Sequence, residues 1–340
     1  FDLDNRGKRS VAIDLRTSAG IEAMHLLLEK ADVFVSNYRP AGLQRLGLDH
    51  ETLCRRYPKL VYASVTGMSL RGDEANRQAY DIGAFWSRSG IAHALSSGQD
   101  TPPVQRGGMG DHMTGLGAVA GISAALFHRE KTGEGQLVET SLMRIGTYML
   151  GWDHNVTAAT GEDVVVRGRD EQPNPLINCY KCSDGRWLWM LGLEGDRHWP
   201  QVVEALGAPE WLDEQRFAGI EARMENSAAL TAEMDAILLT KQRDEWGQIF
   251  DEIGVWWAPV QSSIELLTDP QSRAAGCWVE VKTENEETIE MVASPIDFSV
   301  TEWEIANGAP SLGQDTELVL NELGVNWERI MEMKQSGVIP

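Results

Sequence analysis

One carboxylate in the sequence is surrounded by glycines. Asp111 lies in the segment 106–117, RGGMGDHMTGLG, with three glycines before it and two after it. Clusters of glycine are typical of backbone that bends sharply or that a ligand approaches closely. An ionised aspartate in such a segment can act as a nucleophile. These residue types therefore indicate a candidate catalytic centre at Asp111.

The apolar run after this segment is the element that must position Asp111. Residues 116–127 repeat apolar side chains at helical spacing, which predicts a helix that begins at or just after Asp111. The unpaired N–H groups and the dipole of a helix N-terminus favour negative charge, so we expect an ionised carboxylate. Aspartate is also among the commonest N-cap residues, and this segment alone favours that structural role.

The first third of the chain alternates strands and helices. We expect strands at 11–15, 33–37 and 60–65, separated by helices at 18–30 and 41–46. This order predicts βαβ units with a parallel sheet, in which ligands gather beyond the carboxyl ends of the strands. Basic residues occur near these ends: Lys8, Arg9, Arg39, Arg45, Arg71 and Arg77. They suit phosphate groups, although a solvated basic face explains them equally well.

Charge is distributed unevenly along the chain. The net charge is -21, but residues 1–110 hold 14 Lys/Arg against 12 Asp/Glu, whereas residues 111–340 hold 16 against 39. An anionic ligand is therefore expected on the N-terminal third. So acidic a chain is not expected to bind nucleic acid or acidic membranes. The sequence has no apolar run of membrane-spanning length and no signal peptide, so we expect a cytoplasmic protein.

The length of 340 residues predicts two domains. We expect a large α/β domain at 1–150, a linker at 151–178 and a smaller α+β domain at 179–290. A return linker and C-terminal helices at 291–340 are expected to pack on the large domain. Cys179 and Cys182 form a CxxC pair, but no second pair follows, so two cysteines on a strand hairpin are preferred to a metal or redox site.

Eight segments of the chain form an ordered set. They are NRGKRS (5–10), DVFVSNYRP (32–40), LQRLG (43–47), PKLVYAS (58–64), AYD (79–81), GDHMTG (110–115), HREKTGEGQ (128–136) and LGQDT (312–316). Together they resemble the class III CoA-transferases, which share their fold with the α-methylacyl-CoA racemases. The resemblance implies a Rossmann-like parallel-sheet domain, a smaller α+β domain and an interlocked homodimer.

The resemblance also implies that Asp111 is the catalytic residue. Its carboxylate would attack an acyl-CoA thioester, and the released thiolate would then form an aspartyl-CoA thioester that an acceptor carboxylic acid resolves. Backbone N–H groups of the glycines would stabilise the oxyanions. By the same resemblance, coenzyme A is bound by Lys8, Arg9, Asn37, Tyr38, Arg39, Arg45 and Tyr80. No metal is expected.

Two other activities stay open. Racemases of this fold carry a His-Asp pair where this chain has Tyr80-Asp81, so two-base racemisation is not favoured, although His112 could supply a base beside Asp111. Family members have a βα segment ahead of the position of Phe1, and its absence suggests a catalytically idle CoA-binding protein as a further alternative. The glycine-rich lid of formyl-CoA transferases has no match at 167–175, so formyl transfer is not favoured.

Overall fold

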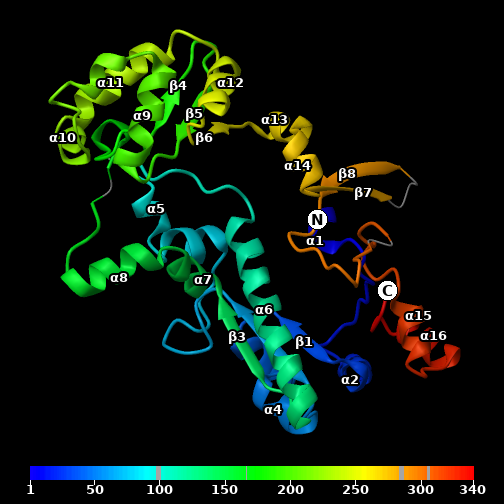
Figure 1. Cartoon of the computed structure of the whole chain (residues 1–340). Helices are drawn as coiled ribbons and strands as arrows, with labels where there is room; N and C mark the ends of the chain where they lie inside the picture. Colours follow the sequence, from blue (N-terminus) through cyan, green and yellow to red (C-terminus); the bar gives the residue numbers. More distant parts are fainter. Residues whose placement is uncertain (97–100, 166, 283–286, 305–306) are drawn as a thin grey trace. The chain divides into compact units, whose positions relative to one another are not determined.

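The computed structural model describes residues 1–96, 101–165, 167–282, 287–304 and 307–340 (Figure 1). The contacts within the chain define two compact units. The first comprises residues 1–96, residues 101–164 and Trp278–Pro340. The second runs from Val165 to Cys277. Each unit has its own sheet and its own buried core.

The first unit contains a parallel sheet with its helices and a separate β-hairpin. Its elements are α1 (Asp2–Asn5), α2 (Ser18–Lys30), β1 (Val33–Ser36), α3 (Pro40–Leu46), α4 (His50–Arg56), β2 (Val61–Thr66), the π-helical segment η1 (Ile82–Ser87), α5 (Ile91–Ala94), α6 (Met109–Thr132), β3 (Leu137–Ser141), α7 (Leu142–Met149), α8 (Gly151–Thr160), β7 (Trp278–Lys282), β8 (Thr288–Val292), α15 (Thr316–Glu322) and α16 (Trp327–Gln335).

The predicted parallel sheet is confirmed. Strands β1, β2 and β3 pair in that order, and both pairings are parallel. Val35 lies opposite Ala63, and Thr66 lies opposite Ser141. All three strands therefore end at one edge of the sheet, where the connections that follow β1 and β2 can meet.

The two faces of this sheet are covered by different helices. Tyr62 is buried in a cluster with leucines of α2, α3 and α4. Val138, one residue along β3 from the partner of Tyr62, faces the other way. There α6 packs closely, because a Cβ on Gly121 would lie 2.6 Å from Cγ1 of Val138. The helix that carries Asp111 thus lies directly on the sheet (Figure 1).

The expected strand at 11–15 is wrong. These residues pair with none of the described strands and are bound instead to the C-terminal part of the unit. The Ala12 N–H donates to Oγ1 of Thr316 at 2.9 Å, and the Asp14 N–H donates to the Val338 carbonyl at 2.8 Å. The apolar alternation of this segment is therefore satisfied by helices α15 and α16 rather than by a neighbouring strand.

Two predicted boundaries also differ from the structure. The stretch predicted as the linker 151–178 begins with helix α8, none of whose residues is buried. The hairpin β7–β8 belongs to the first unit, although the domain predicted at 179–290 would include nearly all of it. The guanidinium of Arg6 donates to the Val292 carbonyl at 2.6 Å, which ties this hairpin to the N-terminal segment.

The second unit is an antiparallel sheet covered by helices. Its elements are the short 3-10 helix η2 (Arg169–Glu171), β4 (Cys179–Lys181), β5 (Trp187–Met190), α9 (Gly195–Leu206), the 3-10 helix η3 (Pro209–Leu212), α10 (Ile220–Glu225), α11 (Ser227–Leu238), α12 (Arg243–Ile253), β6 (Trp257–Val260), α13 (Ser263–Thr268) and α14 (Pro270–Ala274). The order of its strands is β4-β5-β6.

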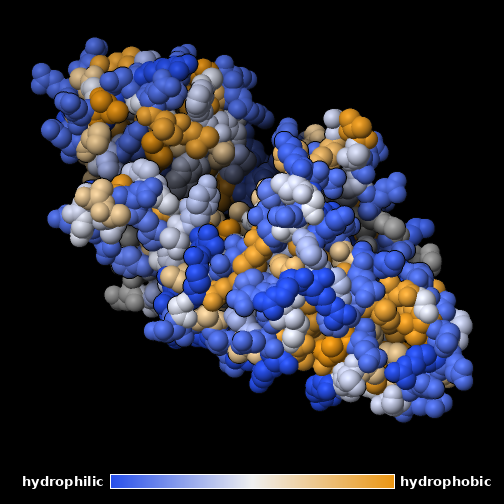
Figure 2. All heavy atoms as spheres, turned by 90° about the horizontal axis from the view of Figure 1, so that it is seen from below, coloured by the Kyte–Doolittle hydropathy of each residue, from blue (hydrophilic) through white to orange (hydrophobic). Residues whose placement is uncertain are grey.

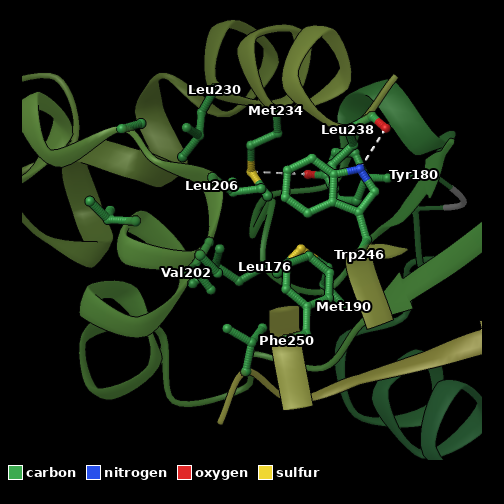
Figure 3. Close-up of a cluster of buried hydrophobic side chains, with 14 of the residues drawn as sticks. Leu176, Tyr180, Met190, Val202, Leu206, Leu230, Met234, Leu238, Trp246 and Phe250 are labelled. Atoms are coloured by element: carbon green, nitrogen blue, oxygen red, sulfur yellow. Dashed lines mark hydrogen bonds between the residues drawn. The ribbon is translucent and has the colours of Figure 1, made fainter. Parts of the chain in front are cut away.

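Aliphatic, methionine and aromatic side chains form the core of this unit (Figure 3). The hydroxyl of Tyr180 donates to the sulfur of Met234 at 3.4 Å, and the indole N–H of Trp246 donates to the Leu238 carbonyl at 2.9 Å. These two buried polar groups keep hydrogen-bond partners, whereas the indole N–H of Trp199 in the same core has none among the described residues. The hairpin predicted around Cys179 is confirmed as β4–β5.

Candidate active site

Asp111 lies in the first turn of α6. The helix begins earlier than the apolar pattern predicts, at Met109, so that Gly108 is its N-cap and Asp111 is its third residue. Gly108 has φ +77°, a left-handed conformation that glycine adopts without strain. Asp111 is therefore not the capping residue, and its exposed side chain is free to serve another role.

Asp81 supports the start of this helix. Its Oδ2 accepts a hydrogen bond from the Gly110 N–H at 3.1 Å, which satisfies one of the unpaired donors of the helix N-terminus. A Cβ on Gly110 would lie 2.1 Å from Oδ1 of Asp81 and 2.3 Å from Cγ of Phe85. Only glycine lets the helix backbone approach the carboxylate so closely. This Gly110 N–H already has an acceptor, so it is not a free oxyanion donor as the sequence suggested.

The electrostatic environment raises the pKa of Asp111 above its usual value. Desolvation of the carboxylate is the largest cause, followed by the negative charge of Asp81 and then that of Asp4, whereas the charge of His112 acts in the opposite direction. The helix N-terminus is expected to favour the ionised form, whereas desolvation and the like charges of Asp81 and Asp4 act against it. Titratable groups with a perturbed pKa in exposed positions are typical of functional sites.

The side chain of His112 contacts α1. Its Nε2 lies 3.0 Å from Oδ1 of Asp4. On its other side the ring packs on the backbone, since a Cβ on Gly108 would lie 3.2 Å from its Cε1. His112 is thus engaged by a carboxylate and by the helix start, which does not favour its use as a second base.

A cavity of about 350 Å³ lies at the carboxyl edge of the parallel sheet. Four of the seven residues predicted to bind coenzyme A line it: Asn37, Tyr38, Arg39 and Tyr80. Thr66, Arg77 and Gln78 complete its polar wall. A Cβ on Gly67 would lie 2.5 Å from Cβ of Ala79, so this glycine brings the end of β2 against the segment that carries Tyr80.

The other three predicted residues do not line this cavity. Lys8 donates through Nζ to Oδ1 of Asn5 at 3.3 Å. Arg9 makes a two-point ion pair with Glu322, with its closer contact at 2.8 Å. Arg45 is an exposed residue in the last turn of α3. The structure thus groups the residues that follow β1 and β2 and leaves the basic residues of the N-terminal segment and α3 outside the group.

The connection between the cavity and Asp111 was missed by sequence reasoning. Tyr80 lines the cavity, and the next residue, Asp81, holds the start of α6. The cavity and the helix turn with Asp111 are therefore joined through two consecutive residues. The AYD motif was the available signal, but nothing in the sequence indicates that its carboxylate bonds to Gly110.

A larger cavity of about 870 Å³ lies elsewhere in the first unit. It follows the sheet-facing side of α6 at Gly117 and Gly121 and is bordered by Glu139, Arg144 and Tyr148. Glu139 there accepts hydrogen bonds from the Ser69 hydroxyl and the Leu70 N–H. Its size exceeds that of the strand-end cavity, but among its described lining residues none belongs to the predicted site.

The cysteines of the second unit are not poised for chemistry. Burial raises the pKa of Cys179 and raises that of Cys182 to about 11.

Within the described residues, no three His, Cys, Asp or Glu side chains form a group able to hold a metal ion. No described helix is both long and apolar enough to cross a membrane.

Comparisons with known proteins agree on one family. An (R)-2-hydroxy-4-methylpentanoate CoA-transferase of Clostridioides difficile is 28% identical over 339 residues, which cover 100% of this chain and 84% of that protein. A cinnamoyl-CoA:phenyllactate CoA-transferase of Clostridium sporogenes is 30% identical over 339 residues, which cover 98% of this chain and 82% of that protein.

Structure comparison gives the same result. The crystal structure of a CAIB/BAIF family protein from Brucella suis matches with a TM-score of 0.81 and 30% sequence identity, and the match covers 94% of this chain and 82% of that one. The sequence model described as CoA-transferase family III matches residues 1–316. The chain therefore belongs to CoA-transferase family III.

Proposed function

We propose that this protein moves coenzyme A between two carboxylic acids through a covalent aspartyl-CoA thioester on Asp111. The membership of the family and the names of its relatives support a CoA-transferase. The observation that carries the residue assignment is the pair Tyr80-Asp81, which joins the strand-end cavity to the helix turn that presents Asp111.

The chemistry needs no redox step and no net proton transfer. A carboxylate oxygen of Asp111 attacks the acyl carbon of the donor thioester, the C–S bond breaks, and CoA thiolate leaves behind an acyl-aspartyl anhydride. The thiolate then attacks the aspartyl carbonyl and releases the donor acid as a carboxylate. The acceptor carboxylate then attacks the aspartyl-CoA thioester, which forms a second anhydride and releases CoA thiolate. The thiolate attacks the acyl carbon of the acceptor in this anhydride and gives the new acyl-CoA and free Asp111.

The raised pKa of Asp111 fits a nucleophile. Partial desolvation and the negative charges of Asp81 and Asp4 destabilise the carboxylate before the reaction. Attack on the thioester removes that charge from Asp111, so the repulsion is relieved as the bond forms. At neutral pH the group must still be ionised, and the nearby His112 favours the ionised form.

The strand-end cavity is the proposed binding site for part of coenzyme A. Arg39 and Arg77 supply positive charge for phosphate groups, and the exposed ring of Tyr38 supplies a flat surface for the adenine. Lys8 and Arg9 remain part of the proposal as phosphate contacts, and so does Arg45. Arg9 would have to exchange its ion pair with Glu322 for such a contact.

The proposed assembly is an interlocked homodimer in the cytoplasm. Apolar side chains are exposed along α6 and α8, among them Val119 (53%), Phe127 (64%) and Trp152 (72%). Figure 2 shows orange apolar areas between the hydrophilic ones on the face that it presents. Exposed apolar areas of this kind are typical of protein interfaces. Light scattering coupled to size-exclusion chromatography would show one species of twice the chain mass.

A single set of incubations separates the proposed activity from its alternatives. Purified protein is mixed with an acyl-CoA and a second acid from a panel of 2-hydroxy, aromatic, short-chain and dicarboxylic acids, and the CoA esters are analysed by chromatography. A transferase forms the second acyl-CoA, and Asp111→Asn does not. Incorporation of solvent deuterium at the α-carbon without exchange of acids would indicate a racemase, and binding without either reaction would indicate an idle protein.

A further inference from the structure

A hydrogen bond connects the N-terminal helix to the turn that carries Asp111. Nε2 of His112 lies 3.0 Å from Oδ1 of Asp4, and the two side chains are 51% and 57% exposed. His112 follows Asp111 directly, and its ring also packs against the backbone of Gly108. The imidazole is therefore held between the N-cap of α6 and a carboxylate of α1.

Helix α1 contacts α6 through the side chain of Asp4. It spans Asp2–Asn5, and none of its residues is buried. Just after it, Arg6 donates to the Val292 carbonyl and the Gly7 N–H donates to the Asn307 carbonyl at 2.9 Å. Those bonds hold the end of the segment to β8 and to the chain beyond it. The contact with His112 holds the segment to α6.

The segment fixed in this way carries a residue of the proposed CoA site. Lys8 donates to Oδ1 of Asn5 at 3.3 Å, so the position of its ammonium group depends on the position of α1. The contact of Asp4 with His112 helps to fix the position of this exposed helix. The Asp4–His112 contact therefore relates a proposed phosphate ligand to the turn that presents the proposed nucleophile.

We propose that His112 is a positioning residue for the transfer reaction, which holds Asp4 and the Lys8 segment against the first turn of α6. This inference rests on the proposed function of Asp111 and Lys8. The contact also links two charges that act on Asp111. The charged groups around Asp111 are Asp4 from α1, Asp81 at the start of η1 and His112 on α6 itself.

The test uses His112→Gln, Asp4→Asn, their double variant and Asp2→Asn as the matched control. Asp2→Asn removes a carboxylate from the same exposed helix without changing the His112 contact. The first readout is the dissociation constant of coenzyme A by titration calorimetry. We expect both single variants to weaken binding by about two- to fivefold, the range for an exposed ion pair. The double variant should be no weaker than either single one, because all three lose the same contact.

The second readout is the pH at which the adduct on Asp111 begins to form. Because the charge of His112 lowers the pKa of Asp111 and that of Asp4 raises it, His112→Gln should move the lower pH limit of adduct formation, the acidic limb, to higher pH, and Asp4→Asn should move it to lower pH. Opposite shifts are the signature that a merely structural contact does not produce. The inference fails if both variants bind coenzyme A as Asp2→Asn does, if their effects multiply in the double variant, or if the limb shifts in one direction in both. A wild-type protein without any adduct would refute the proposed function instead, and the binding series would still decide on the contact.

Discussion

Replacement of Gly110 by alanine tests how closely α6 must approach Asp81. The new Cβ would lie 2.1 Å from Oδ1 of Asp81, 2.3 Å from Cγ of Phe85 and 2.6 Å from Cβ of Phe85. Distances below 3.0 Å require the neighbours to move. Phe85 is 1% exposed in a packed cluster and cannot move freely. The ring and the carboxylate would therefore have to shift together.

The expected loss of stability is the sum of two destabilising effects and one stabilising effect. Overpacking of a buried site costs about 1–3 kcal/mol. Loss of the Asp81 hydrogen bond to the Gly110 N–H adds about 1 kcal/mol. Alanine gains about 0.5–1 kcal/mol over glycine inside a helix, which offsets part of this cost. The net loss for Gly110→Ala is therefore about 1–3 kcal/mol, with a looser start of α6 and weaker transferase activity.

Gly115→Ala in the same helix is the matched control. A Cβ there would have no atom within 4 Å, and the residue is exposed. We expect this variant to be stabilised by about 0.5–1 kcal/mol. Urea unfolding gives the overall change. Because the chain has two units, hydrogen exchange of the peptides that cover 81–88 and 109–117 reports the start of α6 directly.

The two variants should therefore differ in sign. If Gly110→Ala unfolds at the same urea concentration as the wild type and its peptides exchange at the same rate, then the close approach of α6 to Asp81 is wrong. The account of how Asp111 is positioned would then have to be abandoned.

Three other outcomes are expected. Asp81→Asn keeps an acceptor for the Gly110 N–H but removes the charge that raises the pKa of Asp111, so the acidic limb of the pH-rate profile should move to lower pH; a shift to higher pH would contradict this. Asp111→Asn should raise the unfolding temperature slightly at pH 7. The gain in the free energy of unfolding should be less than about 1 kcal/mol, because the side chain is exposed. Because its folded pKa is raised, the carboxylate is destabilising above that pKa, and the advantage of Asn should vanish below pH 3 in scanning calorimetry. Arg39→Ala should weaken coenzyme A binding about tenfold, as for the loss of one hydrogen bond to a charged group, while Arg55→Ala on the exposed side of α4 should not.

Local patterns were sufficient for the central part of the fold. The apolar runs at 33–37 and 60–65, separated by a helical pattern, predict a parallel sheet, and β1 and β2 form it. Helix and strand periods are properties of a few neighbouring residues, so they can be seen in the sequence. Gly133, which ends α6, has φ +80°, a left-handed conformation typical of glycine after a helix.

Long-range contacts explain what the sequence could not show. Val11–Leu15 has the pattern of a strand, but its partners are Thr316 and Val338, some three hundred residues away. The glycines around Asp111 hide the true start of α6, because they carry no apolar periodicity. The bond from Gly110 to Asp81 and the hydrogen bond of His112 with Asp4 also depend on tertiary structure.

The candidate site could be predicted only in part, because long-range contacts place some of its residues. Asn37, Tyr38 and Arg39 directly follow a strand, so their place at the sheet edge could be expected, and Tyr80 joins them in one cavity. Arg9 was assigned by motif alone, and its ion pair with Glu322 could not be seen from a segment near the start of the chain. The pKa of Asp111 is raised by desolvation and by acidic residues of other elements, which the sequence alone could not show.

The most direct measurement is the mass of the peptide that contains Asp111 after the protein has been exposed to an acyl-CoA and quenched in acid. The account predicts a peptide heavier by one coenzyme A minus water, which hydroxylamine converts to the hydroxamate and which is missing in Asp111→Asn. An adduct on another residue, or transfer of coenzyme A by Asp111→Asn at the wild-type rate, would contradict it.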